Sequence, residues 1–312
     1  MNHAHFINYC LLLASQGRGK VRANPMVGSV LVRGDKIVAE AFHLSFGQAH
    51  AERALLERFE GAIESDDVLY VNLEPCCHRG KTPPCTDIII EKGIKRLVFG
   101  MLDPNAQVSG KGIAILREAG VEVVGPVLPE VCERFNRGFV SVQKSGRPWI
   151  TLKKAQTRSG QISNKNGSPL KITDQIQDEW SHTRLRARHD AILVGVQTII
   201  SDDPKLTVRY GDISFQPARI VLDPNGRMPK EANAVGGRMI VVTKETKGTK
   251  ETKESKENGI ERIQIPFKNG SFDLDKLWKA LDITSILVEG GERTWKSFKD
   301  VGMIDEEVIL IG

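Results

Sequence analysis

The amino-acid sequence predicts an α/β protein made of two domains, on three observations. The chain has 312 residues, a length more typical of two hydrophobic cores than of one. Between residues 6 and 124, short apolar strands alternate with segments of helical periodicity, which is the pattern of a layered α/β domain. The polar stretch Lys144–Pro148 then precedes a second alternation that starts at Trp149. We therefore expect one domain at residues 1–145 and another at residues 146–312.

In the first half, apolar residues recur at helical spacing from Phe6 to Ala14, and Gly17 is placed to end that helix. Alternating or continuously apolar runs predict strands at 27–32, 37–41, 68–73, 97–99 and 121–124. Further helices are expected to open at residues 50–52 and to cover 86–92 and 112–119. Side chains on the strand-to-helix turns would then lie where α/β sheets usually bind ligands.

The residues that bear chemistry concentrate in two places of the first half. His50 and Glu52 open a helix, while Cys76 and Cys85 lie within the stretch 73–85. Two thiolates and one imidazole suit a zinc ion that keeps its fourth position open for water. Glu52 is two residues from His50, close enough to reach that water without being a ligand. A metal that lowers the pKa of a water, beside a carboxylate that carries its proton, is a hydrolytic deamination centre.

The combination is more specific than its parts. A His-x-Glu pair or two cysteines alone indicate little, but with Pro75 before the first cysteine they form a zinc nucleobase-deaminase signature. One departure is that eight residues, instead of two, separate Cys76 from Cys85. The alternative, buried cysteines and a core histidine, requires four residue types to coincide. We expect one zinc ion per chain and leave the role of the adjacent Cys77 open.

Composition excludes several classes of protein. A hydrophobic content of 40% is too high for a disordered chain, and no apolar run reaches the roughly 18 residues of a membrane span. Five cysteines and no export signal argue against a disulfide framework and predict a cytoplasmic protein. The chain carries a net charge of +5, and the polar tract Lys244–Gly259, with five lysines and four glutamates, is expected to be a mobile surface loop. We therefore expect neither a membrane nor a nucleic-acid partner.

In the second half, apolar runs predict strands at 149–152, 191–195, 219–222, 239–242 and 285–288. Thr173 is the expected N-cap of a helix that reaches Arg188, and another helix is expected from about Arg293. The strand at 285–288 ends in Glu289-Gly290-Gly291 just before that helix. Paired glycines there can hold a phosphate on exposed backbone N–H groups, although they also form ordinary tight turns.

The loop between Cys76 and Cys85, with its Gly-Lys-Thr-Pro-Pro-Cys end, resembles the deaminase domain of bifunctional riboflavin-biosynthesis deaminase/reductases. The second half resembles the reductase domain of the same family at Lys153 with Ala155, 185–187, 190–195, Thr198, 202–209 and 289–291. Together the two resemblances cover nearly the whole chain. They imply a cytidine-deaminase-like α/β/α first domain and a dihydrofolate-reductase-like α/β second domain that uses NADPH.

The resemblance also implies roles for individual residues. Those that would bind the deaminase substrate are Asn24, His43, Lys81, Asp103 and Asn105. Those that would bind NADPH are Ala155, Thr198, Asp202 and Gly291. Those that would bind the reductase substrate are Ser168, Arg186, Leu206, Arg209 and Glu289. The two arginines suit a phosphate because guanidinium forks pair with it bidentately. The alternative is that these are ordinary turn, core and surface residues.

Three features depart from the family pattern in the second half. Thr157-Arg158-Ser159-Gly160 stands where the family has Ser-Leu-Asp-Gly, and a tryptophan shortly before Ile172-Thr173 is absent. The chain ends at Gly312, about where family members continue with further strands, so the second domain is expected to be truncated at its C-terminus. A missing closing hairpin would leave a strand edge unpaired.

The function that these observations predict is riboflavin biosynthesis. The first domain would deaminate a diaminopyrimidinone that carries a phosphoribosylamino group. The second would reduce the ribosyl chain to ribityl with NADPH, in a homo-oligomer whose partner is this small molecule. Two alternatives remain. One is a single-activity deaminase whose second domain serves only dimerisation or stability. The other is a deaminase of tRNA or nucleosides, against which the long cysteine loop and the NADPH-type domain argue.

Overall fold

The chain divides into two compact units, residues 1–145 (unit 1) and residues 146–312 (unit 2). The computed structural model describes residues 2–80, 82–162, 170–210, 215–245, 254–257 and 259–312, and only the backbone of 254–257. Within these residues, no helix combines the length and the apolar character needed to cross a membrane.

Unit 1 is built on a five-stranded sheet in the order β2-β1-β3-β4-β5. Its first strand, β1 (Gly28–Arg33), runs antiparallel to β2 (Lys36–Phe42) and to β3 (Val68–Val71). Parallel pairing then joins β3 to β4 (Arg96–Phe99) and β4 to β5 (Glu122–Val124). Every residue of β3 is buried, which fits a central strand with both faces covered.

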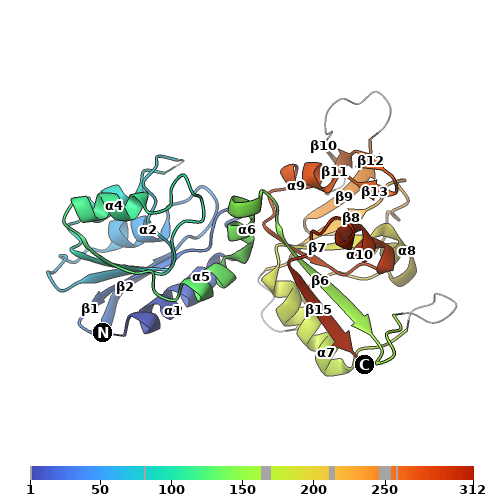
Figure 1. The fold of residues 1–312 in the computed structure, drawn as a ribbon, viewed down its shortest axis with the longest axis horizontal. Coiled ribbons are helices and arrows are strands. Elements are labelled where there is room, and N and C mark those ends of the chain that lie inside the picture. Colours follow the sequence, from blue (N-terminus) through green and yellow to red (C-terminus); the bar gives the residue numbers. More distant parts are fainter. Residues whose placement is uncertain (1, 81, 163–169, 211–214, 246–253, 258) are drawn as a thin grey trace. The chain divides into compact units, whose positions relative to one another are not determined.

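Helices cover both faces of this sheet. Figure 1 shows α1 (His3–Ala14) and α5 (Pro129–Phe135) on one face, and α2 (Ala51–Arg58) and α4 (Lys111–Glu118) on the other. The helix α3 (Cys85–Glu91) packs beside α2 and α4, and α6 (Arg137–Ser145) follows α5. This is the α/β/α layering that the alternating pattern predicts. One continuous apolar cluster fills the unit.

Unit 2 contains an eight-stranded sheet in the order β10-β11-β9-β8-β7-β14-β6-β15. Its parallel strands are β6 (Trp149–Gln156), β7 (Ala191–Gly195), β8 (Ala218–Leu222), β9 (Met239–Lys244), β11 (Ile260–Ile265), β14 (Ser285–Val288) and β15 (Glu306–Ile311). The edge strand β10 (Glu254–Glu257) is antiparallel to β11. Although far apart in the sequence, β6 and β15 lie side by side (Figure 1).

The remaining elements of unit 2 are α7 (Gln175–Trp180), α8 (Val196–Asp202), α9 (Leu274–Lys279), α10 (Glu292–Lys299) and the short hairpin of β12 (Phe267–Lys268) and β13 (Ser271–Phe272). Successive residues of one strand enter different cores: Leu193 belongs to one apolar cluster, while Ile192 and Val194 belong to another. Both faces of the sheet are therefore covered, as expected for a parallel sheet.

Two sequence-based expectations for unit 2 are wrong. The N-cap of α7 is Asp174 and not Thr173, because Asp174 and Gln177 form a reciprocal capping box. The helix then passes into a π turn (Ser181–Leu185) and a 3₁₀ turn (Arg186–Arg188). In the polar tract, residues 254–257 form β10 instead of a loop. An edge strand can form from polar residues because it needs only backbone hydrogen bonds. Residues 246–253 lie outside the described part of the chain.

Candidate functional site

The three expected zinc ligands converge in unit 1. His50 is the N-cap of α2, Cys76 lies in the loop after β3, and Cys85 is the first residue of α3. His50 Nδ1 lies 3.4 Å from Cys76 Sγ and 3.5 Å from Cys85 Sγ. Tetrahedral zinc, with bonds of about 2.0 Å to nitrogen and 2.3 Å to sulfur, spaces such atoms about 3.5 Å apart. The donor atoms therefore fit one zinc ion.

Local backbone geometry prepares the two sulfurs for a metal. The backbone N–H of Cys85 donates to Cys76 Sγ at 3.4 Å, and the N–H of Thr86 donates to the carbonyl oxygen of Cys76. These are first-turn N–H groups of α3, so the positive end of the helix dipole faces the sulfur. A helix N-terminus favours thiolate over thiol, which is the form that binds zinc.

The thiols of Cys76 and Cys85 affect each other's pKa. The hydrogen bond from Cys85 lowers the pKa of Cys76 to about 4, while the same contact and burial raise the pKa of Cys85 well above its ordinary value. The metal-free pair therefore keeps one proton near neutral pH, and zinc must displace it on binding.

Glu52 lies beside the donor atoms but is not part of the converging set. Its side chain occupies the second position of α2, is buried with 3% exposure, and interacts electrostatically with Cys85. Burial raises the pKa of Glu52 to about 7. A carboxyl group with such a pKa can both accept and return a proton near neutral pH.

A cavity of about 340 Å³ opens onto this centre. Its wall includes His50, Glu52 and Cys76, together with four of the five residues expected to bind the deaminase substrate: Asn24, His43, Asp103 and Asn105. The fifth, Lys81, lies outside the described residues, although its neighbours Gly80 and Thr82 line the cavity. Among these expected residues, Asn24 and Asn105 are the farthest apart in the sequence, at 81 positions.

His43 is a buried side chain with a defined tautomer. Its Nδ1 lies 3.0 Å from the carbonyl oxygen of Ala49, which can only accept, so Nδ1 carries the proton. Nε2 therefore accepts from Asn24 Nδ2 at 3.2 Å, which fixes the orientation of that amide. Burial lowers the pKa of His43, so the ring is neutral at neutral pH. The alternative of a surface histidine is excluded.

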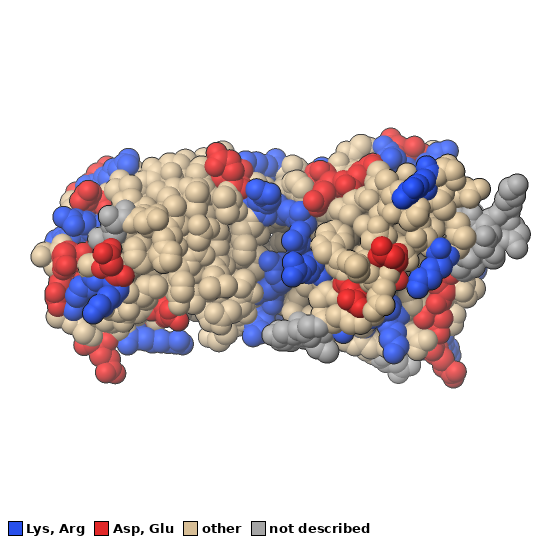
Figure 2. Space-filling view, turned by 90° about the horizontal axis from the view of Figure 1, so that it is seen from below, with Lys and Arg blue, Asp and Glu red and all other residues tan. Residues whose placement is uncertain are grey.

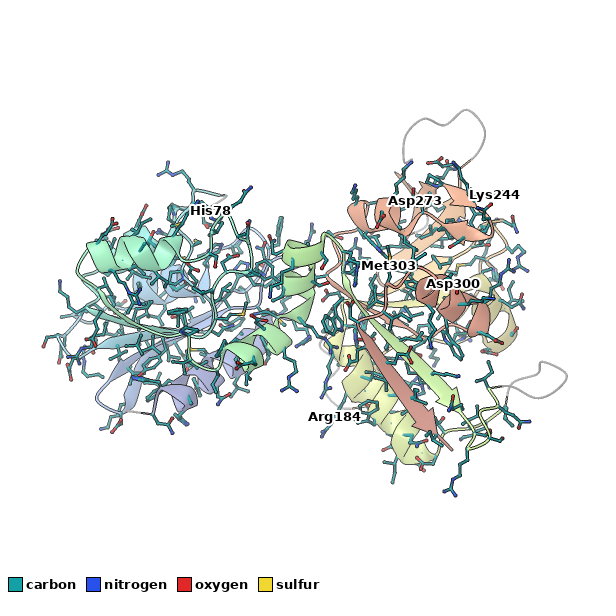
Figure 3. All side chains as sticks on the ribbon, viewed as in Figure 1. His78, Arg184, Lys244, Asp273, Asp300 and Met303 are labelled. Carbon is teal, nitrogen blue, oxygen red and sulfur yellow. The ribbon has the colours of Figure 1, made fainter. Side chains whose placement is uncertain are left out.

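Two side chains of the loop after β4 help to shape that loop. Asp103 Oδ1 accepts from the N–H of Asn105 at 2.8 Å, and Asn105 Oδ1 accepts from the N–H of Gln107 at 2.9 Å. Burial raises the pKa of Asp103, whereas the nearby His78 favours its carboxylate. Figure 3 shows His78 on the same side of unit 1 as α4.

Sequence reasoning missed two asparagines that hold the other wall of the cavity. Asn136 Oδ1 accepts from the N–H of Met26 at 2.9 Å, and its Nδ2 donates to the carbonyl of Met26 at 3.0 Å. Asn72 donates to the same carbonyl and accepts from the N–H of Gly28. These four hydrogen bonds from Asn72 and Asn136, which we call the Met26 clamp, hold the backbone at Met26 and Gly28. They thereby fix the neighbouring segment, which carries Asn24 and Pro25 into the cavity. Pairs 46 and 110 positions apart leave no signal in local periodicity.

In unit 2, three of the residues expected to bind NADPH lie at the carboxyl ends of neighbouring strands. Ala155 is in the last part of β6, Thr198 is on the helix after β7, and Gly291 is the N-cap of α10, which follows β14. Such an edge is where α/β sheets bind ligands. Asp202 ends α8 and is exposed.

The residues expected to bind the reductase substrate are arranged differently. Arg186 Nε and Nη2 donate to the two oxygens of Glu289 at 2.7 Å each, and Nη1 donates to the carbonyl of Thr207. Glu289 therefore already engages the guanidinium fork that we expected to meet a phosphate. Leu206 is buried and Arg209 is exposed, while Ser168 lies outside the described residues.

Comparisons with known proteins match both units. A family model for the cytidine and deoxycytidylate deaminase zinc-binding region matches residues 1–101, and the RibD C-terminal domain matches residues 148–312. The riboflavin biosynthesis protein RibD of Aquifex aeolicus is 41% identical over 98% of this chain and 86% of its own length. That of Escherichia coli is 33% identical over 100% of this chain and 88% of its own length.

Solved structures agree with these sequence matches. RibD of Acinetobacter baumannii superposes with a TM-score of 0.83 at 30% identity, over 99% of this chain and 86% of that one. A diaminohydroxyphosphoribosylaminopyrimidine deaminase/5-amino-6-(5-phosphoribosylamino)uracil reductase of Thermotoga maritima gives 0.80 at 35% identity, over 96% of this chain and 84% of that one.

Proposed function

Because the chain belongs to the RibD family of riboflavin-biosynthesis proteins, we propose roles for its individual residues in the two reactions of that family. The protein is a bifunctional enzyme with a zinc-dependent deaminase domain and an NADPH-dependent reductase domain. The predicted family, fold class, activities and two cofactors are thereby confirmed. The observation that carries the residue assignment is the convergence of His50, Cys76 and Cys85 beside a cavity whose wall also contains Glu52.

In deamination, His50, Cys76 and Cys85 hold zinc, which polarises a water and lowers its pKa when bound. Glu52 accepts the proton of that water and passes it to the ring nitrogen. The water oxygen would add to the amino-bearing carbon and form the C–O bond. Glu52 then carries the proton of the resulting hydroxyl group to the amino group, which leaves as ammonia as the C–N bond breaks and the hydroxyl becomes a carbonyl. Neutral His43 and the amide of Asn24 orient the pyrimidine, and Lys81, Asp103 and Asn105 complete its site.

In reduction, NADPH supplies the hydride to the ribose carbon, and the protein mainly positions the two reactants. Ala155, Thr198, Asp202 and Gly291 hold the cofactor; Ser168, Arg186, Leu206, Arg209 and Glu289 hold the substrate. The three strand ends that carry Ala155, Thr198 and Gly291 support this assignment. The buried pair of Arg186 and Glu289 places one carboxylate at the end of β14, beside the expected cofactor turn.

The proposal takes a phosphorylated diaminopyrimidinone as the substrate, in keeping with the small phosphorylated pyrimidines of RibD enzymes. On the face shown in Figure 2, acidic and basic side chains lie next to one another over part of the surface, while Lys and Arg side chains also gather in one strip. The absence of a nucleic-acid partner, a homo-oligomeric state and a cytoplasmic location belong to this proposal and stay predictions.

The test is to incubate the zinc-loaded protein with the diaminopyrimidinone phosphate, with and without NADPH, while ammonia and NADPH oxidation are followed separately. We expect ammonia in both samples and NADPH oxidation only where deamination has occurred. Ammonia without NADPH oxidation, together with no NADPH binding at millimolar concentration, would contradict the roles proposed in unit 2. Excess tRNA as a competitor should leave the rate of ammonia release unchanged.

A further inference from the structure

Glu74 is a buried carboxylate with three backbone donors and no role in the chemistry described above. Its Oε2 accepts from the N–H of Asp103 at 3.1 Å and from the N–H of Gly110 at 2.9 Å. Its Oε1 accepts from the N–H of Gly112 at 3.0 Å. The side chain is 3% exposed and lies two positions before Cys76. One carboxylate thus links the metal-binding segment to a loop on the cavity wall.

These contacts replace a helix cap. The N-cap of α4 is Gly110, which has no side chain, and the first-turn N–H of Gly112 is satisfied by Glu74 from another segment. A negative charge at this end of α4 also complements the helix dipole. A Cβ on Gly112 would lie 2.1 Å from the carbonyl oxygen of Pro75, so α4 rests directly on the backbone that leads to Cys76.

The segment held by Glu74 is the one that faces the cavity. Asp103 is at its start and Gly110 at its end, and between them lies Asn105; Asp103 and Asn105 both line the cavity. Their side chains are also engaged in shaping the loop backbone. The Glu74 side chain therefore links the loop that carries these two residues to the segment that carries Cys76.

We propose that Glu74 is a positioning residue for deamination, which holds the loop 103–110 in register with the zinc-binding residues. The proposal rests on the substrate-binding roles given above to Asp103 and Asn105. Two carboxylate oxygens can accept three N–H donors, whereas an amide offers one oxygen and an NH₂ group that would face a donor. Replacing the carboxylate by an amide should therefore free one end of the loop, and displacement by about 1 Å can cost on the order of a hundredfold in rate.

The experiment compares Glu74→Gln with Asp67→Asn. Asp67 is another buried carboxylate of unit 1, which accepts from the N–H of Glu64 and pairs with Arg33. Both substitutions neutralise a carboxylate without changing its size. We expect both to lower the melting temperature, but only Glu74→Gln to raise the KM for deamination, by roughly tenfold to a hundredfold. Zinc content should stay at the wild-type value in both variants.

A second measurement is independent of activity. Amide hydrogen exchange should become faster at Asp103, Gly110 and Gly112 in Glu74→Gln and stay unchanged there in Asp67→Asn. Should Glu74→Gln fail to fold, Glu74→Asp keeps the charge on a shorter side chain, and we expect the same changes to be smaller.

Two outcomes would overturn the proposal: a KM within about twofold of the wild type in a folded Glu74 variant, or unchanged protection of the three amides. Equal losses of melting temperature without a change in KM would make Glu74 merely structural. If the wild-type protein releases no ammonia, the proposed function fails instead. Hydrogen exchange then decides whether Glu74 holds the loop.

Discussion

The two units bury their polar side chains in different ways. In unit 1, one imidazole and two thiols converge with the spacing of zinc ligands, and the carboxyl group of Glu52 lies beside them on the cavity wall. In unit 2, Arg186 and Glu289 satisfy each other through two hydrogen bonds of 2.7 Å. The donor atoms of the first cluster suit a cation, whereas the two charges of the second already pair with each other. Removing one member should therefore abolish ligand binding in unit 1 and lower folding stability in unit 2.

The largest expected effect is on Cys85→Ser. This variant should lose most of its zinc, with affinity reduced by more than the roughly 10- to 100-fold typical of outer-sphere substitutions. Unit 1 should also melt at a lower temperature, since metal binding is coupled to folding. Metal analysis and thermal melting provide the measurement. Cys77→Ser is the matched control and should keep its zinc; full zinc in Cys85→Ser would exclude Cys85 as a ligand.

Glu52→Gln separates proton transfer from metal binding. It should retain zinc but deaminate more slowly by about two to four powers of ten, the usual range for removing a proton shuttle. Glu57→Gln, an exposed residue on the same helix, should deaminate at the wild-type rate. Ammonia release and zinc content are measured on the same samples. A zinc-free Glu52→Gln would assign Glu52 to the metal itself.

Glu289→Gln tests the claim that the cluster in unit 2 is complete without a ligand. It leaves the buried Arg186 unpaired, and the free energy of unfolding of unit 2 should fall by about 3–5 kcal/mol in urea denaturation. Replacing both partners, as Arg186→Met with Glu289→Leu, should recover much of that loss. Glu122→Gln, in the exposed pair with Arg96, should change stability by less than about 1 kcal/mol. If Glu289→Gln also lowered the free energy of unfolding by less than about 1 kcal/mol, the buried pair would not stabilise unit 2 as proposed.

Acid should act on the same cluster in two successive pH ranges. Burial and the neighbouring arginines lower the pKa of His182 to about 4. As the pH falls, His182 therefore binds a proton in the unfolded protein before it does so in the folded one. The free energy of unfolding should then decrease between about pH 6.5 and 4. Burial opposes ionisation of Glu289, but Arg186 outweighs it and holds the pKa at about 2, so its contribution is lost between about pH 4.5 and 2. In His182→Gln, the free energy of unfolding should depend less on pH between about 6.5 and 4. In Glu289→Gln, it should depend less on pH between about 4.5 and 2.

The smallest expected effect concerns the cavity wall. Asn136→Ala removes the acceptor of the Met26 N–H and one donor to the Met26 carbonyl. The free energy of unfolding of unit 1 should therefore fall by about 1–2 kcal/mol. Because Met26 follows Asn24 and Pro25, the KM for deamination should rise by a few fold, whereas zinc content should not change. Asn233→Ala in unit 2 is the control and should leave this KM unaltered. An unchanged KM in Asn136→Ala would limit the clamp to a structural role.

The sequence predicted the zinc centre well because its signals are local. His50 and Glu52 open one helix, as expected at residues 50–52, and Cys85 opens another, one residue before the helix expected at 86–92. Most strands of both sheets also appear within a few residues of their expected positions, since each is a short apolar run. The deviations come from competing local chemistry, as where Asp174 caps α7 in place of Thr173.

What the sequence could not provide depends on contacts between distant residues. Glu74 meets Gly112 across 38 positions, and Arg186 meets Glu289 across 103. A periodic pattern shows that a residue is buried or turned outward, but not which partner it meets. The pairing of Arg186 with Glu289 was not expected for this reason, and a phosphate-binding role of Arg186 stays a prediction. Elements such as α6, α9 and β15 were also not recognised, because short amphipathic segments give weak periodic signals.

The Met26 clamp shows which residues a gene segment must encode to carry the whole deaminase domain. The matching family region stops at residue 101, yet Asn136 and the cavity residue Phe139 come from the segment just before unit 2. A gene fragment ending at residue 101 would encode the zinc ligands without part of the wall that meets the substrate. Any recombination that exchanges reductase partners should therefore preserve the chain through residue 145.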